Sequence, residues 1–517
     1  MSKLYFLPKR FSFLVFSVLS VLIFLAWSEN AAAGSLSAKG AFSVYDFGAA
    51  GNGKKLDTAA IQSAIDACAK AGGGKVYLHN GIFLSGTIYL KSSVNLCIEA
   101  GATLLGSKNL EDYAGNSIIS AEGAANIAVL GRGVIDGQGA VFDADKKRPF
   151  LIRFERCENV AVKDIALRDS SAWAQLYRAC ENVNIDGISV DSRVNRNNDG
   201  LNIDNCRRVC VSNCQISSGD DALVLKSIGG HGCENVTITN CVLSTSCNAL
   251  KMGTESTGGF KNITISNCAV YDTRLAGLAL EIVDGGALER VNVSNIVMEN
   301  VGAAIFIRLG NRARSYEGEK PGMGLIKGIM INNIQAAGVG STGCSITGLP
   351  NYPAENVTLS NIHIKFKGGG TREDALRQID EKEKNYPEYN MFGTLPAYGF
   401  YCRHARGLRF QYLDLGFERD DHRPALVFED VNDLNIFDFD AQSTASTEAL
   451  IWLRQVNGAF IHGCRPCRKV STFLRVDSEL SDNITLINND LSNVERLFQR
   501  GEGVKDLAVY VGANRTG

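Results

Sequence analysis

Short runs in which β-branched and polar residues alternate recur along most of the chain beyond about residue 75, separated by Asn, Asp and Gly. In Val236-Thr237-Ile238-Thr239 the apolar positions have the period of two that is typical of a half-buried β-strand. The second apolar residue of each run falls at Val162, Ile185, Val211, Ile238, Ile265 and Val293, then at Ile331, Leu359, Phe410, Ile436, Ile461 and Leu486. A strand-like repeat of this length excludes helical repeats and predicts an all-β fold, a single parallel β-helix of stacked coils.

Besides a Gly- and charge-rich insertion at 309–324, two segments depart from the repeat. Near the N-terminus, Asp57-Thr58 can cap a helix that ends at Gly72-Gly73-Gly74 and covers the first coil. The apolar stripe of this helix contains Ala60, Ile61, Ala64, Ile65 and Cys68. The second segment, about 368–396, is too long for an ordinary turn, so we expect it to fold over one face and to wall a binding cleft.

The first residues resemble an export signal. Basic residues precede an apolar run from Phe11 to Trp27, and Ala31-Ala32-Ala33 provides a cleavage site. We therefore predict a signal peptide at 1–33 and one β-helix domain at 34–517, secreted or periplasmic, with no stable membrane span after cleavage. The alternative is an uncleaved anchor. With a net charge of -2 the chain lacks the basic excess of a nucleic-acid-binding protein.

The 15 cysteines are odd in number and do not form a compact disulfide framework. Cys206, Cys214, Cys241 and Cys268 each follow an Asn, a position that predicts small, buried rungs inside the coils. Cys464-Arg465-Pro466-Cys467 has no second pair to complete a zinc site, so we predict neither a metal nor another cofactor.

Three aspartates are the strongest candidates for chemistry. Asp220 and Asp221 are adjacent, and Asp199 lies about one repeat upstream, so stacking would bring the three carboxylates together. Like charges this close cannot all ionise freely, so one pKa should rise while another stays low, as cleavage of a glycosidic bond requires. The alternative interpretation is that they are turn residues at coil corners.

These residues resemble the polygalacturonase family, glycoside hydrolase family 28, over roughly residues 41–490. The resemblance includes Val44-Tyr45-Asp46-Phe47-Gly48-Ala49, the segment 131–139 (GRGVIDGQG), Asn198-Asp199-Gly200 and Gly219-Asp220-Asp221. It implies a right-handed, pectin-lyase-like β-helix that acts on pectin. It also implies that Asp220 is the general acid, and that Asp199 and Asp221 position and deprotonate the attacking water, with inversion at the anomeric carbon.

The chain departs from this family at two motifs. Asn248 stands where the family's Gly-His-Gly places histidine, and the Gly-His-Gly at 230–232 lies at an edge loop instead. The Arg-Ile-Lys that holds a substrate carboxylate is also missing: Gly277-Leu278-Ala279-Leu280-Glu281 takes its place, and a glutamate there would repel a uronate. The predicted substrate-binding residues are Lys226, Lys251, Asn198, Arg308 and Arg312.

The sequence thus predicts an exported inverting hydrolase that cuts galacturonosyl linkages in a pectic polysaccharide. Within the same family, a rhamnogalacturonan hydrolase and an exo-galacturonosidase are the alternatives. A polysaccharide lyase, or a β-helix that binds glycan without cutting it, would be a different class. Endo or exo action and the oligomeric state stay open.

Overall fold

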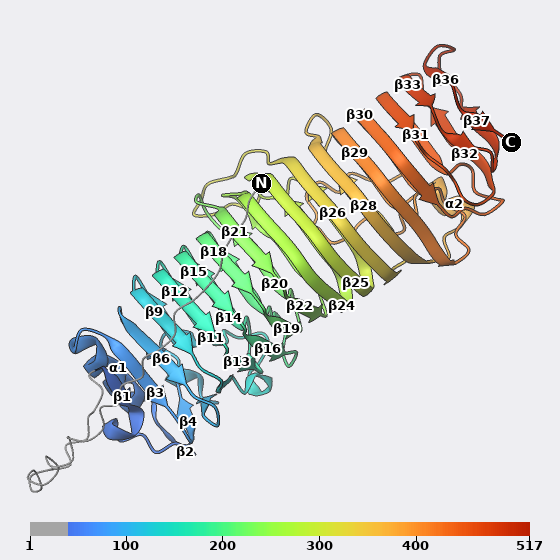
Figure 1. The fold of residues 1–517 in the computed structure, drawn as a ribbon. Coiled ribbons are helices and arrows are strands. Elements are labelled where there is room, and N and C mark those ends of the chain that lie inside the picture. The colour runs from blue at the N-terminus through green and yellow to red at the C-terminus, as the bar shows by residue number, and fades with distance from the viewer. Residues whose placement is uncertain (1–39) are drawn as a thin grey trace, which may run out of the picture. The chain divides into compact units, whose positions relative to one another are not determined.

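Parallel strands stack in three rows along an elongated solenoid, with the helix α1 (Thr58–Lys70) at the N-terminal end of the stack (Figure 1). The computed structural model describes residues 40–517, so the predicted signal peptide at 1–33 lies outside the described residues. The pairings link each strand to the strand of the same row in the next coil, as in a parallel β-helix. The predicted all-β fold class is confirmed.

The first row contains β1 (Ala41–Ser43), β3 (Gly74–Leu78), β6 (Val94–Ile98), β9 (Ala125–Leu130), β12 (Glu158–Lys163), β15 (Glu181–Asp186), β18 (Arg207–Ser212), β21 (Cys233–Thr239), β33 (Asp482–Ile487) and β36 (Val509–Gly512). The second row contains β2 (Asn52–Leu56), β4 (Ile82–Ser85), β7 (Thr103–Gly106), β10 (Val134–Asp136), β13 (Ala166–Arg168), β16 (Ser189–Ser192), β19 (Gln215–Ser218) and β22 (Val242–Thr245). The third row contains β5 (Ile88–Tyr89), β8 (Ser117–Glu122), β11 (Phe150–Glu155), β14 (Gln175–Arg178), β17 (Leu201–Asp204), β20 (Leu223–Ser227), β23 (Leu250–Ser256), β27 (Cys344–Thr347), β32 (Val470–Asp477) and β35 (Val494–Arg500).

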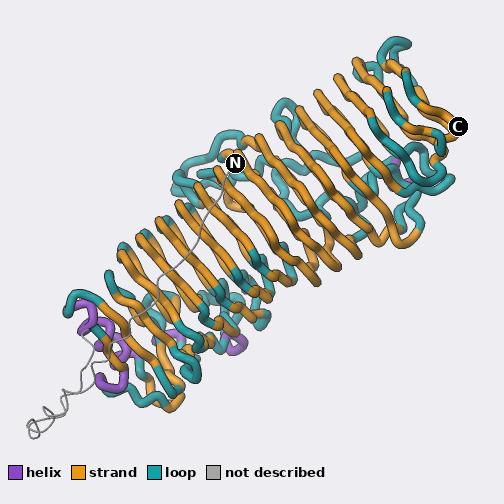
Figure 2. The backbone as a smooth tube through the Cα atoms, in the orientation of Figure 1, coloured by secondary structure: helices purple, strands orange, loops and turns teal. Residues whose placement is uncertain are grey.

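Beyond residue 260 most strands are long, and several of them span more than one row (Figure 2). They are β24 (Phe260–Ile282), β25 (Ala287–Leu309), β26 (Leu325–Val339), β28 (Ala354–Gly368), β29 (Phe400–Arg419), β30 (Leu426–Ala441) and β31 (Ile451–His462). A separate two-stranded sheet pairs β34 (Asp490–Leu491) with β37 (Arg515–Thr516).

The predicted repeat is the register of the first row. Val162 pairs with Ile185, Ile185 with Val211, and the pairing continues through every predicted position to Leu486. These side chains are buried in one continuous core, because alternate residues of each strand point into the solenoid. The four cysteines predicted as rungs are buried and unpaired, as are most of the other cysteines.

Asparagines near the start of first-row strands adopt a left-handed backbone conformation. Asn235 and Asn262 have φ of 58° and 57°, the left-handed conformation that Asn tolerates better than most residues. Their side chains stack in a ladder in which Asn262 Nδ2 donates to Asn235 Oδ1 at 2.8 Å. The Asn-x-Thr pattern at these positions therefore follows from the geometry of the coil.

The helix α1 buries Ile61, Ala64, Ile65 and Cys68 against the first coil, as predicted. Its expected cap differs: the Asp57 side chain makes no bond to the helix. Instead its buried carboxylate accepts hydrogen bonds from Ala50 N at 2.7 Å and Gly51 N at 2.9 Å, which ties the preceding loop to the helix start.

The second interruption crosses the stack as a strap, which we define as residues 369–399 and which contains the short helix α2 (Arg372–Ala375). Asn311 N donates to Glu383 O at 2.6 Å, and Tyr389 and Met391 of the strap pack on Ala276, Ala279 and Phe306. The strap thus covers part of the third row beyond the candidate site.

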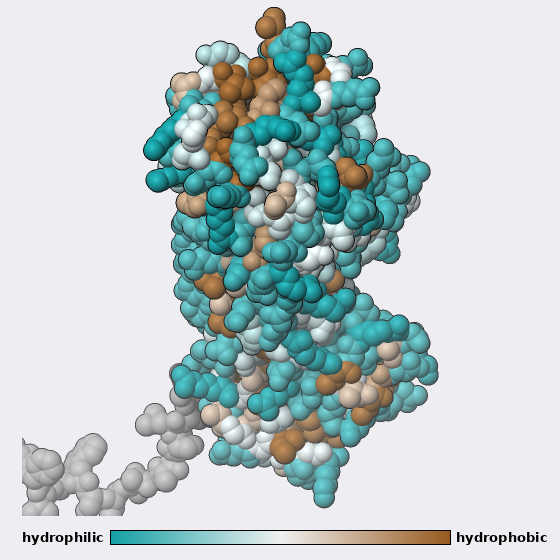
Figure 3. Space-filling view, turned by 90° about the vertical axis from the view of Figure 1, so that its right-hand side faces the viewer, coloured by the Kyte–Doolittle hydropathy of each residue, from teal (hydrophilic) through white to brown (hydrophobic). Residues whose placement is uncertain are grey.

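Most of the face shown in Figure 3 is hydrophilic, with apolar side chains scattered or in small groups. No helix within residues 40–517 is long and apolar enough to cross a membrane.

Candidate active site

The three predicted aspartates lie at the turns that lead into neighbouring strands of the third row. Asp199 precedes β17, and Asp220 and Asp221 precede β20. The turns are stacked by backbone hydrogen bonds, since Gly200 N donates to Asp221 O at 2.9 Å and Ala222 N donates to Asn248 O at 2.9 Å. All three aspartates line one cleft of about 530 Å³. The convergence expected from the repeat is therefore present.

Asp199 is buried beside a lysine. Its Oδ2 lies 3.7 Å from Lys226 Nζ, which also lies 3.5 Å from Glu255. Burial raises the pKa of Asp199 well above its usual range, and Lys226 offsets this only in part. Asp199 is thus the carboxyl that tends to keep its proton.

Asp221 is equally buried, but its surroundings favour the ionised form. Lys251 Nζ lies 3.1 Å from its Oδ2, while the Asn248 backbone N–H and side-chain Nδ2 donate to its Oδ1 at 3.2 and 3.0 Å. Burial opposes ionisation, yet Lys251 and Lys226 outweigh it, so the pKa of Asp221 is lowered. The sequence predicted one raised and one low pKa among these acids, and Asp199 and Asp221 have them.

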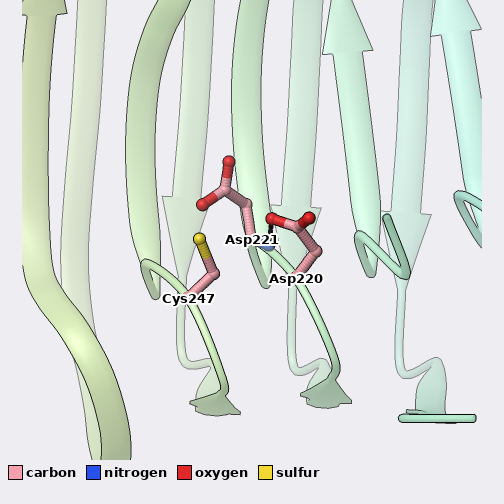
Figure 4. Close-up of side chains that lie close together, drawn as sticks. All are labelled: Asp220, Asp221 and Cys247. Atoms are coloured by element: carbon pink, nitrogen blue, oxygen red, sulfur yellow. Dashed lines mark hydrogen bonds between the residues drawn. The ribbon is translucent and has the colours of Figure 1, made fainter. Parts of the chain in front are cut away.

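Asp220 is half-buried, and among residues 40–517 no cation lies within ion-pair distance of it. Figure 4 shows its carboxylate beside Asp221, with Cys247 from the next turn facing the pair. The backbone of this turn is fixed, because Ser218 Oγ donates to Asp220 O at 2.6 Å and Thr245 Oγ1 donates to the same oxygen. Of the three aspartates, Asp220 therefore has the carboxyl group most accessible to a ligand.

One donor atom each from Asp220, Asp221 and Cys247 lie within 4.8 Å of one another, a spacing that could hold a metal ion. The donor set fits poorly, since an ion would compete with Lys251 for Asp221. Burial also raises the pKa of the Cys247 thiol, which disfavours the thiolate that a metal ligand or nucleophile needs. We therefore derive no step through a metal.

Glu281, which the sequence placed where it would meet a uronate, does not line the cleft. Its side chain is fully buried behind the cleft, where Lys251 Nζ lies 3.8 Å from Oε2 and Thr254 Oγ1 donates to Oε2 at 3.0 Å. Burial raises the pKa of Glu281 to about 8, because Lys251 is nearer to Asp221 and one ammonium cannot compensate two buried carboxylates. A neutral, buried Glu281 would not repel a uronate at neutral pH.

Three of the five predicted substrate-binding residues, Lys226, Lys251 and Asn198, lie next to the candidate catalytic aspartates. Lys226 lines the cleft, and Lys251 lies directly behind Asp221. Asn198 is buried and holds the turn, since its Nδ2 donates to Ser170 O at 2.8 Å and Ala172 O at 2.9 Å. The other two are arginines.

Arg308 is 1% exposed, and its guanidinium donates to Gly348 O at 3.2 Å and Glu381 O at 2.6 Å. Arg312 Nε donates to Asp284 Oδ1 at 2.9 Å at the margin of the cleft. Both guanidinium groups are thus engaged by the protein itself, so none of Arg308, Arg312 and Asn198 is among the substrate contacts proposed below.

The strap contributes residues that the sequence did not single out. Tyr386 lines the cleft, and Lys251 Nζ lies 3.4 Å from its hydroxyl. Glu388 has a buried Oε2 without a hydrogen-bond partner, and burial raises its pKa to about 7 despite the nearby Lys251. The break in the repeat indicated that this segment walls the cleft, but no periodicity showed which of its side chains face inward.

Aromatic residues complete the cleft wall. Trp173 lines it, with Lys226 Nζ 4.9 Å from the centre of a Trp173 ring. Tyr398 and Tyr401 are fully buried and do not line the cleft. His231 of the misplaced Gly-His-Gly lies in an exposed loop that lines a different hollow.

Three converging carboxylates beside two lysines, on a β-helix, form a site suited to acid–base cleavage of a glycosidic bond. The model of the family described as glycosyl hydrolases family 28 matches residues 69–384, more than half of the chain. The chain therefore belongs to this family, as the motifs predicted.

Relatives and solved structures agree with this assignment. The chain is 29% identical over 215 residues to a probable polygalacturonase of Vitis vinifera, covering 36% of this chain and 44% of the relative. It is 26% identical over 248 residues to an exo-poly-alpha-D-galacturonosidase of Dickeya chrysanthemi, covering 35% and 41%. The chain thus spans less than half the length of these curated relatives. An exopolygalacturonase structure from Thermotoga maritima superposes with a TM-score of 0.55 at 22% identity, covering 63% of this chain and 87% of that one, which shows the fold.

Proposed function

We propose that this protein is an inverting glycoside hydrolase that cuts galacturonosyl linkages in a pectic polysaccharide. The observation that carries the proposal is the placement of Asp199, Asp220 and Asp221 in one cleft in three different electrostatic environments. Membership of glycosyl hydrolases family 28 and the names of the relatives support the reaction class and the substrate.

Asp220 is the proposed general acid. It lines the cleft, and no cation within residues 40–517 is paired with its carboxyl group, so this group is free to approach the departing glycosidic oxygen and donate a proton to it. Asp221 is kept ionised by Lys251 and accepts a proton from the attacking water, whose oxygen bonds to the anomeric carbon. Asp199, with its raised pKa, can donate a hydrogen bond that positions this water.

We propose that Lys226, Trp173 and Tyr386 contact the substrate, with Lys251 and Arg312 as positioning residues. Trp173 and Tyr386 offer apolar ring surface to a sugar, and Lys226 supplies a cation within the cleft. Lys251 and Arg312 support the cleft from behind, through Asp221 and Asp284 respectively. We further propose that residues 1–33 are a cleaved export signal, since a polymer of plant cell walls is met outside the cell.

The test is product analysis with homogalacturonan and, separately, with rhamnogalacturonan backbone. We expect release of reducing ends that Asp220→Asn abolishes, with the product's anomeric configuration inverted by NMR. Asp191→Asn, at an exposed aspartate that lines neither this cleft nor the neighbouring hollow with Arg193 and Arg274, is the matched control for loss of one carboxylate. An unsaturated, ultraviolet-absorbing product would instead identify a lyase, and binding without turnover would identify a glycan-binding protein.

A further inference from the structure

A second hollow adjoins the catalytic turns on another side of the strap. It has a volume of about 500 Å³ and is lined among others by Arg193, Arg274, Lys367, Thr245 and Tyr389. Thr245 joins it to the acid site, because its hydroxyl donates to the backbone oxygen of Asp220. The strap borders both sites, with Tyr386 at the cleft and Tyr389 at the hollow. We call this second site the basic hollow.

The cations of the basic hollow are not neutralised by carboxylates. Among residues 40–517, no Asp or Glu oxygen lies within ion-pair distance of Arg193, Arg274 or Lys367, although many other basic residues of the protein are paired. Asp272 is the one acidic residue in the lining, and its Oδ1 accepts from Asn300 Nδ2 at 2.7 Å. The hollow therefore has an excess of two positive charges.

Neutral partners hold these cations in place. Arg193 donates to Ser217 Oγ at 3.0 Å, Ser244 Oγ at 2.8 Å and Ser246 Oγ at 3.1 Å. Arg274 Nε donates to Ser246 O at 2.6 Å. A guanidinium fixed by neutral acceptors keeps its charge and its remaining N–H groups for an anion.

The cleft on the other side has the opposite character. Its lining holds six acids, the three aspartates with Glu255, Asp284 and Glu317, against the three cations Arg178, Lys226 and Arg314, so acids are in excess. An anionic polymer that lies across the catalytic turns would be repelled on that side and attracted by the basic hollow. The basic hollow thus favours an acidic sugar, whereas the acidic cleft favours a neutral one.

We infer that the basic hollow binds the carboxylate of a uronate unit next to the bond that is cut, with Arg274 and Lys367 as its carboxylate ligands. This inference rests on the proposed function for the position of the scissile bond. It supplies the cationic clamp that the chain lacks at 277–281, from different residues and on a different side of the strap. A neutral or weakly charged sugar then occupies the cleft beside Trp173 and Tyr386.

The test measures binding by calorimetry to full-length protein carrying Asp220→Asn, so that turnover does not interfere. The probes are a galacturonate oligomer and the same oligomer with methyl-esterified carboxyl groups. Arg274→Gln and Lys367→Gln remove one charge each, and Arg290→Gln is the matched control, an exposed arginine outside the hollow that donates to Asn262 Oδ1 at 2.7 Å. Circular dichroism checks that each variant is folded.

We expect each hollow variant to weaken binding of the acidic oligomer about tenfold or more, since a charge-assisted hydrogen bond is lost. Binding of the esterified oligomer and the effect of Arg290→Gln should change less than about twofold, and the salt dependence should decrease in the hollow variants. If both hollow variants bind the acidic oligomer as tightly as the parent, the inference is wrong. In that case hydrolysis by the wild-type protein would still support the proposed function. Conversely, charge-dependent binding without any hydrolysis would support the hollow and refute the proposed function.

Discussion

Replacing Glu281 by glutamine tests whether a buried carboxyl behind the active site is neutral. Glu281 has no exposed surface, its Oε1 has no hydrogen-bond partner, and Lys251 is nearer to Asp221 than to it. Burial raises its pKa from 4.5 to about 8. Glutamine has nearly the shape of the protonated acid and can accept the same bond from Thr254.

The direction of the pH dependence follows from proton linkage. Because the pKa of Glu281 is higher in the folded state, the folded protein holds a proton that the unfolded chain releases above about pH 4.5. The corresponding stability is fully present below the unfolded pKa and is lost as the pH rises through about 8. Between about pH 5.5 and about pH 9 the loss amounts to about 3 kcal/mol, an upper value that assumes no relaxation around the charge.

The assay is urea unfolding followed by tryptophan fluorescence across this pH range. We expect Glu281→Gln to match the wild type in acid and to exceed it by about 3 kcal/mol near about pH 9, where the wild type must bury an anion. Glu299→Gln, at an exposed position of the next strand β25, is the control and should leave the difference between acid and alkali unchanged. Parallel curves for wild type and Glu281→Gln would refute the reasoning, since they would mean that Glu281 is ionised throughout.

Three further variants examine the active site. Asn248→Ala removes the side-chain donor to Asp221, and we expect kcat to fall about tenfold or more with a smaller change in KM, measured by steady-state kinetics. Glu388→Gln removes a carboxyl with a pKa of about 7, so the decline in activity that we expect as the wild-type carboxyl ionises above that pH should shift to higher pH; an unchanged pH–rate profile would contradict a role near the acids. Trp173→Ala should raise KM about tenfold with kcat little changed, because apolar surface for a sugar is lost. A tenfold fall in kcat with KM unchanged would argue against contact between Trp173 and the sugar.

The sequence by itself determined the register of the coils and the convergence of the three aspartates on one cleft. Apolar residues with a period of two, repeated at coil length, can be buried only by stacking, so Val162 through Leu486 align and Asp199 falls beside Asp220 and Asp221. Local pattern suffices here because each coil contacts only its neighbours. For the same reason the helix α1 and its buried stripe could be predicted from spacing alone.

Only the tertiary structure determined the burial, the pKa values and the contacts of the charged residues other than the three aspartates. Arg308 and Glu281 are both polar residues that the sequence places near a cleft, yet both are buried, and burial that Lys251 offsets only in part raises the pKa of Glu281 to about 8. The strap has no periodicity, so its sequence could not show that Tyr386 contacts Lys251, 135 residues away along the chain, or that Glu388 lies close enough to be influenced by its charge. Charge state and long-range contacts depend on distances in space, which a repeat fixes within the coils but not for the segments that leave them.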